Sequence, residues 1–435
     1  MIYDAIVIGS GASGIYFALS SAKKNKKIAI IEKNNLGGTA FYDGCLPVKK
    51  IMDKIKDFNK AKALMEDELV NINFDYDLLF KKAKQTLSNT KSYIENRLKE
   101  NNIDIYYSNP KIISSKKVLI DNKILETKKI VIATGTTPCS FNKDFEIDER
   151  VIFSHKGILK LNELPKELTI LGANVEGVEF ASMFSELDVQ VNLIERENEI
   201  LKGNDYDLIE NIKSRLIDNN VNIILNKEVK NINKKEDKVL ITFSDDTQFE
   251  CKNILITGVR KANIPDMDFS LKLTNSFIEV DKNLQTNIED IYAIGDINGL
   301  HGMAHVAVQQ GILLSDYIYS NKEITFDYKS LPRCIFTINE LAGAGYQENE
   351  LKNCITKKIY FKDSFRGFDN TNDDGFIKLI IKDNKIKGYF INSIDANKMV
   401  GNIGLWINQD VDLEKIKRTL FINPTVFEGL LDAII

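Results

Sequence analysis

The chain has 435 residues, of which 43% are apolar, and this is enough for two or three packed domains. A net charge of −4 offers no basic surface, so we expect no nucleic-acid partner. No stretch approaches the roughly 18 apolar residues of a membrane span, and no charged leader precedes the first strand, so we expect a cytoplasmic protein. The five cysteines form no Cys-x-x-Cys pair and no cluster with the three histidines, which predicts no metal site.

The first residues carry the pattern of a dinucleotide-binding unit. An apolar strand at 5–8 precedes Gly9-Ser10-Gly11-Ala12-Ser13-Gly14, and a helical stretch and a strand at 28–31 then lead to Glu32. Glycines at this spacing permit a tight turn and let N–H groups at a helix N-terminus approach a pyrophosphate. The carboxylate of Glu32 would accept hydrogen bonds from the ribose.

The segments that follow predict other elements. Residues 46–101 are charged and rich in helix formers, and Pro47 is expected to open their first helix because its missing N–H costs nothing there. Residues 103–132 have the composition of short strands joined by turns, and the last of these strands runs into Thr134-Gly135.

The dinucleotide pattern recurs from residue 168. A strand at 168–171 precedes Gly172-Ala173-Asn174-Val175-Glu176-Gly177, and a helix and a strand at 189–194 lead to Glu195. In both copies the acidic residue follows the first glycine by 23 positions, and a later strand of the second copy runs into Thr257-Gly258. Two copies at matching spacing predict two dinucleotide-binding domains. From about residue 325, strand-like segments at 334–337, 376–381 and 386–391 are followed by helices.

Residues 37–49, Gly-Gly-Thr-Ala-Phe-Tyr-Asp-Gly-Cys-Leu-Pro-Val-Lys, resemble the active-site stretch of flavin-dependent disulfide reductases of the dihydrolipoamide dehydrogenase, glutathione reductase and mercuric reductase group. The family pattern is Gly-Gly-Thr-Cys, four residues, then Cys-x-Pro-x-Lys. Here Cys45 is the second cysteine, and Ala40 stands in place of the first. Because each step of disulfide exchange is the attack of a thiolate on a disulfide sulfur, one remaining sulfur cannot complete the relay internally.

This resemblance covers essentially the whole chain and implies an α/β fold in three parts. An FAD-binding domain would comprise residues 1–145 and 276–325, a Rossmann-like NAD-binding domain residues 146–275, and an α+β dimerisation domain residues 326–435. It also implies a homodimer. The segment Tyr292-Ala293-Ile294-Gly295-Asp296 and the pair Ala304-His305 match the second FAD motif of the family, in which Asp296 would bind the ribitol chain. The expected FAD residues are Gly9, Gly11, Gly14, Glu32, Gly38, Thr39, Lys49, Thr134, Gly135, Asp296, Ala304 and His305.

The nicotinamide site departs from the family pattern. The expected NAD(H) residues are Gly172, Gly177, Glu195 and Gly258, and an acidic residue at 195 favours NAD over NADP. Asn174 replaces the middle glycine, Glu176 adds a carboxylate, and Val259 replaces a family glycine. Because asparagine tolerates a left-handed backbone, we expect the turn to survive. The alternative is a Rossmann-like scaffold that binds no nucleotide.

The expected catalytic residues are Cys45, Lys49, Glu179 and Glu428. Cys45 precedes a helix, whose positive end would lower the pKa of the thiol. By the resemblance, Lys49 lies beside the flavin N5 and pairs with Glu179; the alternative is a small buried cysteine and a solvated lysine. The family ends in His-Pro-Thr-x-x-Glu, where this chain has Asn423-Pro424-Thr425-Val426-Phe427-Glu428, and an asparagine cannot move a proton at physiological pH.

Three functions are compatible with these residues. The first is a homodimeric flavoprotein that passes electrons from NADH through FAD to a small-molecule or protein acceptor without a redox-active disulfide. The second keeps sulfur chemistry, with Cys45 cycling through a sulfenic acid or a mixed disulfide. The third is a non-catalytic FAD-binding protein. The chain lacks both the first cysteine of the family, at Ala40, and the histidine base, at Asn423. The loss of both indicates a change of function, so we do not expect a competent dihydrolipoyl dehydrogenase.

Overall fold

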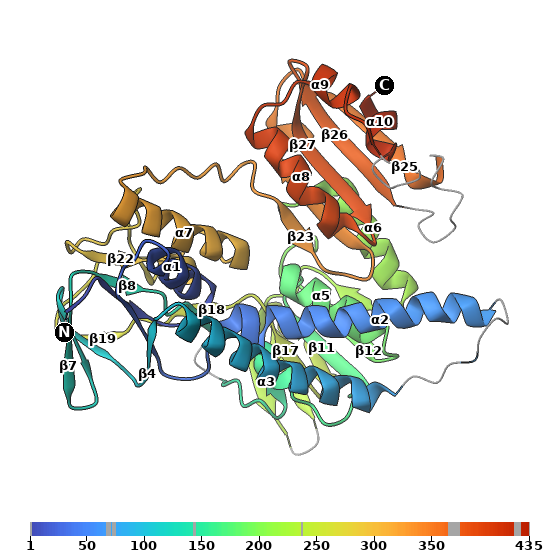
Figure 1. Ribbon diagram of the computed structural model, residues 1–435. Coiled ribbons are helices and arrows are strands. Elements are labelled where there is room, and N and C mark those ends of the chain that lie inside the picture. The colour runs from blue at the N-terminus through green and yellow to red at the C-terminus, as the bar shows by residue number, and fades with distance from the viewer. Residues whose placement is uncertain are drawn as a thin grey trace. The chain divides into compact units, whose positions relative to one another are not determined.

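The computed structural model describes residues 2–66, 71, 75–141, 145–235, 238–363, 375–421 and 428–434. Contacts between residues divide the chain into two compact units, whose helices and strands are labelled in Figure 1. The first unit comprises Met1–Ile51, Asp75–Glu163 and Val259–Thr325, and the second comprises Met52–Phe74, Leu164–Gly258 and Phe326–Ile435.

A parallel sheet forms the centre of the first unit. Its strand order is β22 (Ile291–Ala293), β8 (Ile130–Ile132), β2 (Ala5–Ile8), β3 (Ile28–Glu32) and β4 (Asp104–Tyr107). Strands β2, β3 and β8 are buried at every position, as parallel strands covered on both faces usually are. Helices α1 (Ala12–Ala22) and α7 (Ala304–Ser320) pack closely side by side, as Figure 1 shows. The first predicted strand–helix–strand unit is therefore confirmed.

Smaller sheets complete the first unit. One has the order β1 (Ile2–Tyr3), β7 (Lys123–Thr127), β6 (Lys117–Ile120), β5 (Lys111–Ser114) and β19 (Asp266–Met267). Its apolar side chains share one buried cluster with those of the central sheet. Antiparallel pairs join β9 (Thr136–Pro138) to β18 (Arg260–Ala262) and β20 (Leu273–Thr274) to β21 (Phe277–Ile278), and β10 (Ile152–Phe153) leads into α4 (His155–Ile158).

Two long helices account for most of the predicted helical stretch. Helix α2 spans Cys45–Glu66 and α3 spans Tyr76–Glu100, where the Asp75 side chain accepts a hydrogen bond from the N–H of Leu78. The prediction that Pro47 opens the first helix is wrong by two residues, because α2 begins at Cys45. A proline is tolerated at the third position as well, since the first four N–H groups of a helix have no intrahelical acceptor.

The second unit contains the second dinucleotide-binding pattern. Strands β17 (Ile254–Ile256), β11 (Glu167–Leu171), β12 (Gln190–Ile194) and β13 (Asn222–Ile224) lie side by side in that order and run parallel. Helix α5 (Val175–Ser185) connects β11 to β12, and α6 (Tyr206–Asp218) connects β12 to β13. An antiparallel sheet of β14 (Val229–Lys234), β15 (Val239–Phe243) and β16 (Gln248–Cys251) precedes β17.

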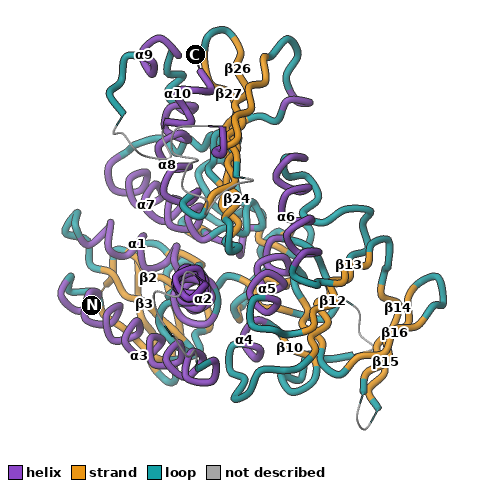
Figure 2. Tube along the Cα trace, turned by 90° about the vertical axis from the view of Figure 1, so that its right-hand side faces the viewer, coloured by secondary structure: helices purple, strands orange, loops and turns teal. Residues whose placement is uncertain are grey.

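An antiparallel sheet with helices against it forms the C-terminal part of this unit. Its order is β23 (Arg333–Ile335), β24 (Glu340–Gly345), β27 (Lys385–Ser393), β26 (Phe376–Lys382) and β25 (Ile355–Tyr360). Helix α8 (Ala396–Asn408) packs against β24 and β27, as Figure 2 shows, and α10 (Glu428–Ile434) packs against β25 and β26. The short α9 (Leu413–Lys417) lies between them in sequence. The strands predicted at 376–381 and 386–391 are confirmed.

A buried lysine joins this sheet to helix α6. The ammonium of Lys378 on β26 lies 2.9 Å from Oδ2 of Asp205 and 2.7 Å from Oδ2 of Asp207, and Lys378 is 1% exposed. Asp205 also caps α6 by accepting the N–H groups of Asp207 and Leu208. Burial alone would lower the pKa of Lys378, but its bonds to Asp207 and Asp205 raise that pKa above its ordinary range.

We expect Lys378→Met to lower the free energy of unfolding by about 3–5 kcal/mol, and with it the melting temperature, because it leaves the buried carboxylate of Asp205 without its cation. Lys382→Met, at the partly exposed end of the same strand, serves as the control and should melt close to the native protein. Differential scanning calorimetry compares the two variants. Equal melting temperatures would show that the buried cation does not stabilise this unit.

Candidate functional site

The turn after β2 requires glycine at two of its three glycine positions. Gly9 has a φ of +100°, and a Cβ on it would lie 2.5 Å from the carbonyl oxygen of Ala133. A Cβ on Gly14 would lie 2.3 Å from the carbonyl oxygen of Gly9. Both contacts are too short for any side chain, so these glycines hold α1 against the strands of the central sheet.

Gly11 has a different role, because its backbone is extended (φ −68°, ψ −176°) and any residue could adopt it. A Cβ there would meet a single atom within 4 Å, the carbonyl oxygen of Ala133 at 3.9 Å. Gly11 therefore leaves open the space above the N-terminus of α1. The helix begins without a side-chain cap, which leaves its first N–H groups available to an anion.

Glu32 closes the other end of this turn. Its Oε2 accepts the N–H of Ser10 at 2.9 Å and the hydroxyl of Ser10 at 2.7 Å, and its Oε1 accepts the N–H of Asn34 at 2.8 Å. These bonds orient a carboxylate that is 9% exposed, and Oε1 keeps a lone pair for a ribose hydroxyl. The sequence did not assign Ser10 this positioning role.

The second FAD motif depends on a glutamine that the sequence did not single out. Strand β22 leads into the 3₁₀ turn η2 (Gly295–Asn298). The side-chain oxygen of Gln310, on α7, accepts the N–H of Gly295 at 2.7 Å and the amide of Asn298 at 3.0 Å. A Cβ on Gly311 would lie 2.4 Å from the carbonyl oxygen of Ser13, so this glycine allows α7 to approach α1 closely.

Asp296 lies in a largely desolvated position within η2. Burial raises the pKa of its carboxyl group, and the nearby Arg260 guanidinium opposes the shift. Arg260 donates a 2.7 Å hydrogen bond to the hydroxyl of Thr136, which lies 3.5 Å from Oδ2 of Asp296. The side-chain amide of Asn263 donates to the carbonyl oxygen of Thr134. Residues 260–263 thus brace the Thr134–Thr136 turn.

The residues of the first unit fit FAD. The hydroxyl oxygen of Thr134 is buried and has no hydrogen-bond partner within the described chain. Gly135, with a φ of +61°, has open space where a Cβ would stand. Together with the open end of α1 and the orientation of Glu32, these features form a cradle for a dinucleotide. Ala304 and His305 lie in the first turn of α7, with His305 exposed.

The active-site segment has an unusual local structure. Gly37 and Gly38 have φ values of +108° and +55°, and the π-helical turn η1 (Thr39–Asp43), which carries Ala40, follows them. Single π-helical turns occur often at functional sites. A Cβ on Gly44 would lie 2.7 Å from Cγ2 of Thr39, so glycine is needed before α2. Cys45, the first residue of α2, is exposed.

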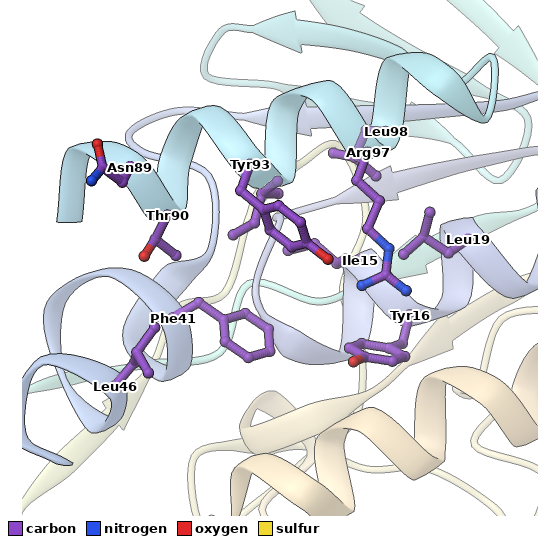
Figure 3. A pocket seen from close by; sticks show the side chains of 11 residues that line it. Ile15, Tyr16, Leu19, Phe41, Leu46, Asn89, Thr90, Tyr93, Arg97 and Leu98 are labelled. Carbon is purple, nitrogen blue, oxygen red and sulfur yellow. The ribbon is translucent and has the colours of Figure 1, made fainter. Parts of the chain in front are cut away.

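An apolar pocket of about 390 Å³ lies beside this segment in the first unit, and Figure 3 shows its lining. Arg97 extends from α3 toward Tyr16 on α1, with its guanidinium carbon 6.0 Å from the centre of the ring. Phe41 from η1 and Leu46 from α2 line the pocket near Ala40 and Cys45 in sequence. This pocket was not predicted, because its α3 residues occur in a charged stretch without a motif.

In the second unit, Glu179 is 6% exposed on α5 and accepts the N–H of Phe336 at 2.9 Å. The hydroxyl of Ser182, one turn later, accepts the N–H of Ile338 at 3.3 Å. These bonds fix α5 to the segment before β24. Lys49 belongs to the first unit, so its pairing with Glu179 stays a prediction. Asn423 lies outside the described residues, and Glu428 begins α10, where its side chain is not described.

The dinucleotide turn of the second unit repeats much of the first. Gly172 has a φ of +103°, and a Cβ on Gly177 would lie 1.8 Å from the carbonyl oxygen of Gly172. Glu195 accepts the N–H groups of Ala173 at 2.6 Å and Glu197 at 3.1 Å, so its carboxylate is oriented as Glu32 is. These residues fit the adenosine ribose of a dinucleotide.

The middle position of this turn differs from our expectation. The turn survives, but a left-handed backbone is not the reason, because Asn174 has a φ of −73° and a ψ of −176°. This is nearly the conformation of Gly11. The asparagine instead matters through its side chain, which caps α5 at the pyrophosphate end of the turn.

Comparison with known proteins identifies the class. Residues 3–311 match the family model for pyridine nucleotide-disulphide oxidoreductase, and residues 331–434 match the dimerisation domain of the same family. The chain therefore belongs to the pyridine nucleotide-disulphide oxidoreductases, a family of flavin-dependent enzymes that use FAD and a pyridine nucleotide.

Within the family, the chain is similar in sequence to dihydrolipoyl dehydrogenases. The chain is 29% identical to a dihydrolipoyl dehydrogenase of Chlamydia pneumoniae, over 98% of this chain and 95% of that protein. It is 28% identical to the dihydrolipoyl dehydrogenase of Geobacillus stearothermophilus, over 99% and 95%. Among solved structures, LpdA of Mycobacterium tuberculosis has a TM-score of 0.92 at 20% identity, covering 99% of this chain and 98% of the other. The HOCl-induced flavoprotein disulfide reductase RclA of Escherichia coli has a TM-score of 0.89 at 23% identity, covering 99% of each. These two likenesses show the fold.

No group of three or more histidine, cysteine or acidic side chains is placed to hold a metal ion within the part of the chain that the structure describes. None of its helices combines the length and apolar character needed to cross a membrane.

We expect Gly11→Asn to reduce the affinity for FAD by at least about tenfold, because a side-chain oxygen would take the N–H groups at the start of α1. The extended backbone of residue 11 should let the variant fold, which circular dichroism checks. The ratio of flavin to protein absorbance measures loading. Gly401→Asn, at an open position of α8, is the control and should load normally. Full loading of Gly11→Asn would contradict the assignment of this turn to the pyrophosphate.

We expect Asp296→Asn to stabilise the FAD-free protein and to weaken FAD binding. Because burial raises the pKa of Asp296, the folded state holds the proton more tightly, and stability falls as the pH rises through the interval between the ordinary and the raised pKa. The ionised carboxyl costs about 1.4 kcal/mol for each unit of that shift. Melting temperatures of the FAD-free protein, measured from acid to neutral pH, report this decline in stability. The decline should be absent in Asp296→Asn and present in Asp432→Asn, which changes an exposed residue and serves as the control.

Proposed function

We propose that this protein is an FAD-dependent oxidoreductase that takes electrons from NADH and delivers them to an acceptor without a redox-active disulfide. One observation carries the proposal. The first unit keeps an open FAD cradle and a complete glycine-braced active-site segment, yet residue 40 in that segment is alanine. A relay between positions 40 and 45 is therefore impossible, while the transfer of electrons from NADH to the flavin requires neither sulfur.

Within this function the residues have separate tasks. Bound FAD would supply the redox chemistry. Gly11 and the N-terminus of α1 would bind its pyrophosphate, Glu32 its ribose and Asp296 its ribitol chain. Lys49, on the first turns of α2, would hold a positive charge beside the ring system, and its proposed partner is Glu179. The family relation and the oriented carboxylate of Glu195 support NADH as the donor.

The domain organisation follows the same proposal. Residues 1–145 and 276–325 would bind FAD, residues 146–275 would bind the pyridine nucleotide, and residues 326–435 would form a homodimer. The match of residues 331–434 to the dimerisation domain supports the last point. The acceptor is unidentified. The apolar pocket beside η1, whose lining includes Tyr16, Phe41 and Tyr93, supports a small apolar acceptor such as a quinone.

A second candidate function rests on Cys45. Its exposed thiol at the first position of α2 is placed to be oxidised by a peroxide to a sulfenic acid, which a small thiol would convert to a mixed disulfide with loss of water. Resolution of such a species requires a second thiol from solution. Anaerobic titration with NADH distinguishes the two functions, because bleaching of the flavin alone supports the first, and a long-wavelength band between thiolate and flavin supports a role for Cys45.

We expect almost no lipoamide–NAD activity in the native protein, while NADH-dependent reduction of an artificial dye persists, since the dye reaction needs neither the missing sulfur nor the missing base. Ala40→Cys should form a disulfide with Cys45 and give feeble turnover. Adding Asn423→His should raise that turnover by roughly 10²–10⁴-fold, the usual contribution of a general base.

Both reactions are measured on the same flavin-loaded preparation. Ala40→Ser serves as the matched control, because it adds a polar atom but no sulfur. Substantial lipoamide activity in the native protein would overturn the proposal. A lack of flavin reduction by NADH would favour a protein that binds FAD without catalysis.

A further inference from the structure

The two dinucleotide turns of this chain allow a direct comparison within one molecule. In the first unit, Gly11 leaves three features open: the space above α1, its first N–H groups and the buried hydroxyl of Thr134. The corresponding positions in the second unit are Asn174, the N-terminus of α5 and Thr257. The backbones at residues 11 and 174 agree within a few degrees, so the differences arise from side chains.

Asn174 occupies the polar groups that Gly11 leaves free. Its Oδ1 accepts the N–H of Glu176 at 2.9 Å and that of Gly177 at 3.3 Å, and its Nδ2 lies 3.1 Å from the hydroxyl of Thr257. A Cβ on Gly258 would lie only 2.3 Å from Nδ2 of Asn174. The asparagine amide therefore fills the space between the start of α5 and the end of β17.

Glu176 adds a negative charge at the same place. Its Oε2 accepts the N–H of Gly258 at 3.3 Å, across the mouth of the turn. As an acidic residue in the first turn of α5, it is favoured by the helix dipole that would otherwise attract a phosphate. A carboxylate and a pyrophosphate in this position would repel each other.

We infer that Asn174 and Glu176 form an internal cap, an amide and a carboxylate that compete with the pyrophosphate of a pyridine nucleotide for the N-terminus of α5. Binding of the nucleotide requires both side chains to move away, so the native protein binds NAD(H) weakly, and removal of the cap increases its affinity. The inference rests on the proposed function only in taking NADH as the donor.

The test uses oxidised, FAD-loaded protein and isothermal titration with two probes, ADP-ribose, which carries the pyrophosphate, and adenosine, which does not. We expect Asn174→Gly and Glu176→Gln each to bind ADP-ribose about tenfold more tightly than the native protein, because each frees charge-assisted hydrogen-bond donors or removes a repulsion. Affinity for adenosine should stay unchanged. Replacement of a capping asparagine by glycine has only a small effect on helix stability, so Asn174→Gly should fold.

Glu210→Gln, which removes an exposed carboxylate from α6, is the control for net charge and should leave both affinities unchanged. Unchanged binding of ADP-ribose by Glu176→Gln and Asn174→Gly, or an equal gain for adenosine, would overturn the inference. If Asn174→Gly loses its FAD or fails to fold, Glu176→Gln decides alone. Failure of NADH to reduce the flavin would count against the proposed donor, whereas a gain for ADP-ribose would still establish the cap.

Discussion

The first N–H groups of an α-helix have no acceptor within the helix, and this protein meets that constraint in two ways. Helix α1 begins at a bare glycine and leaves these groups for a ligand, whereas α5 begins at an asparagine that satisfies them itself. The surrounding strands, glycine contacts and oriented carboxylates are otherwise nearly the same. Two side chains, Asn174 and Glu176, thus distinguish the capped turn of α5 from the open turn of α1.

Several buried charged groups elsewhere have partners within the protein. Glu32 and Glu195 are held by backbone N–H groups of their own turns, and Lys378 is held by two aspartates, one of which caps α6. Asp296 is less well compensated, because burial raises its pKa and Arg260 and Thr136 only partly oppose this shift. A buried carboxyl that the protein itself stabilises poorly is suited to a bound ligand that donates hydrogen bonds to it.

The sequence predicted the repeated strand–turn–helix units and the C-terminal strands, because glycine spacing and apolar runs are local signals. The sequence located the turns but did not reveal which side chains form hydrogen bonds with the polar groups of those turns. Ser10, Gln310 and Arg260 act on partners that are 22, 15 and 124 positions away, and no spacing rule links them. The error in the predicted first residue of α2 has a similar origin. Proline is compatible with several positions in the first turn of a helix, and only the fold determines which of these positions it occupies.

Ala40 lies in a segment whose backbone still requires glycine at three positions. Gly37 and Gly38 keep positive φ values, Gly44 has no room for a side chain, and the π-helical turn between them is retained. The alanine therefore leaves the backbone of the segment intact, and this backbone is compatible with the role in flavin binding that we propose for it. Under the proposed function, the chain lacks one chemical step of the family but keeps the site, so it would bind and reduce the flavin without reducing a disulfide.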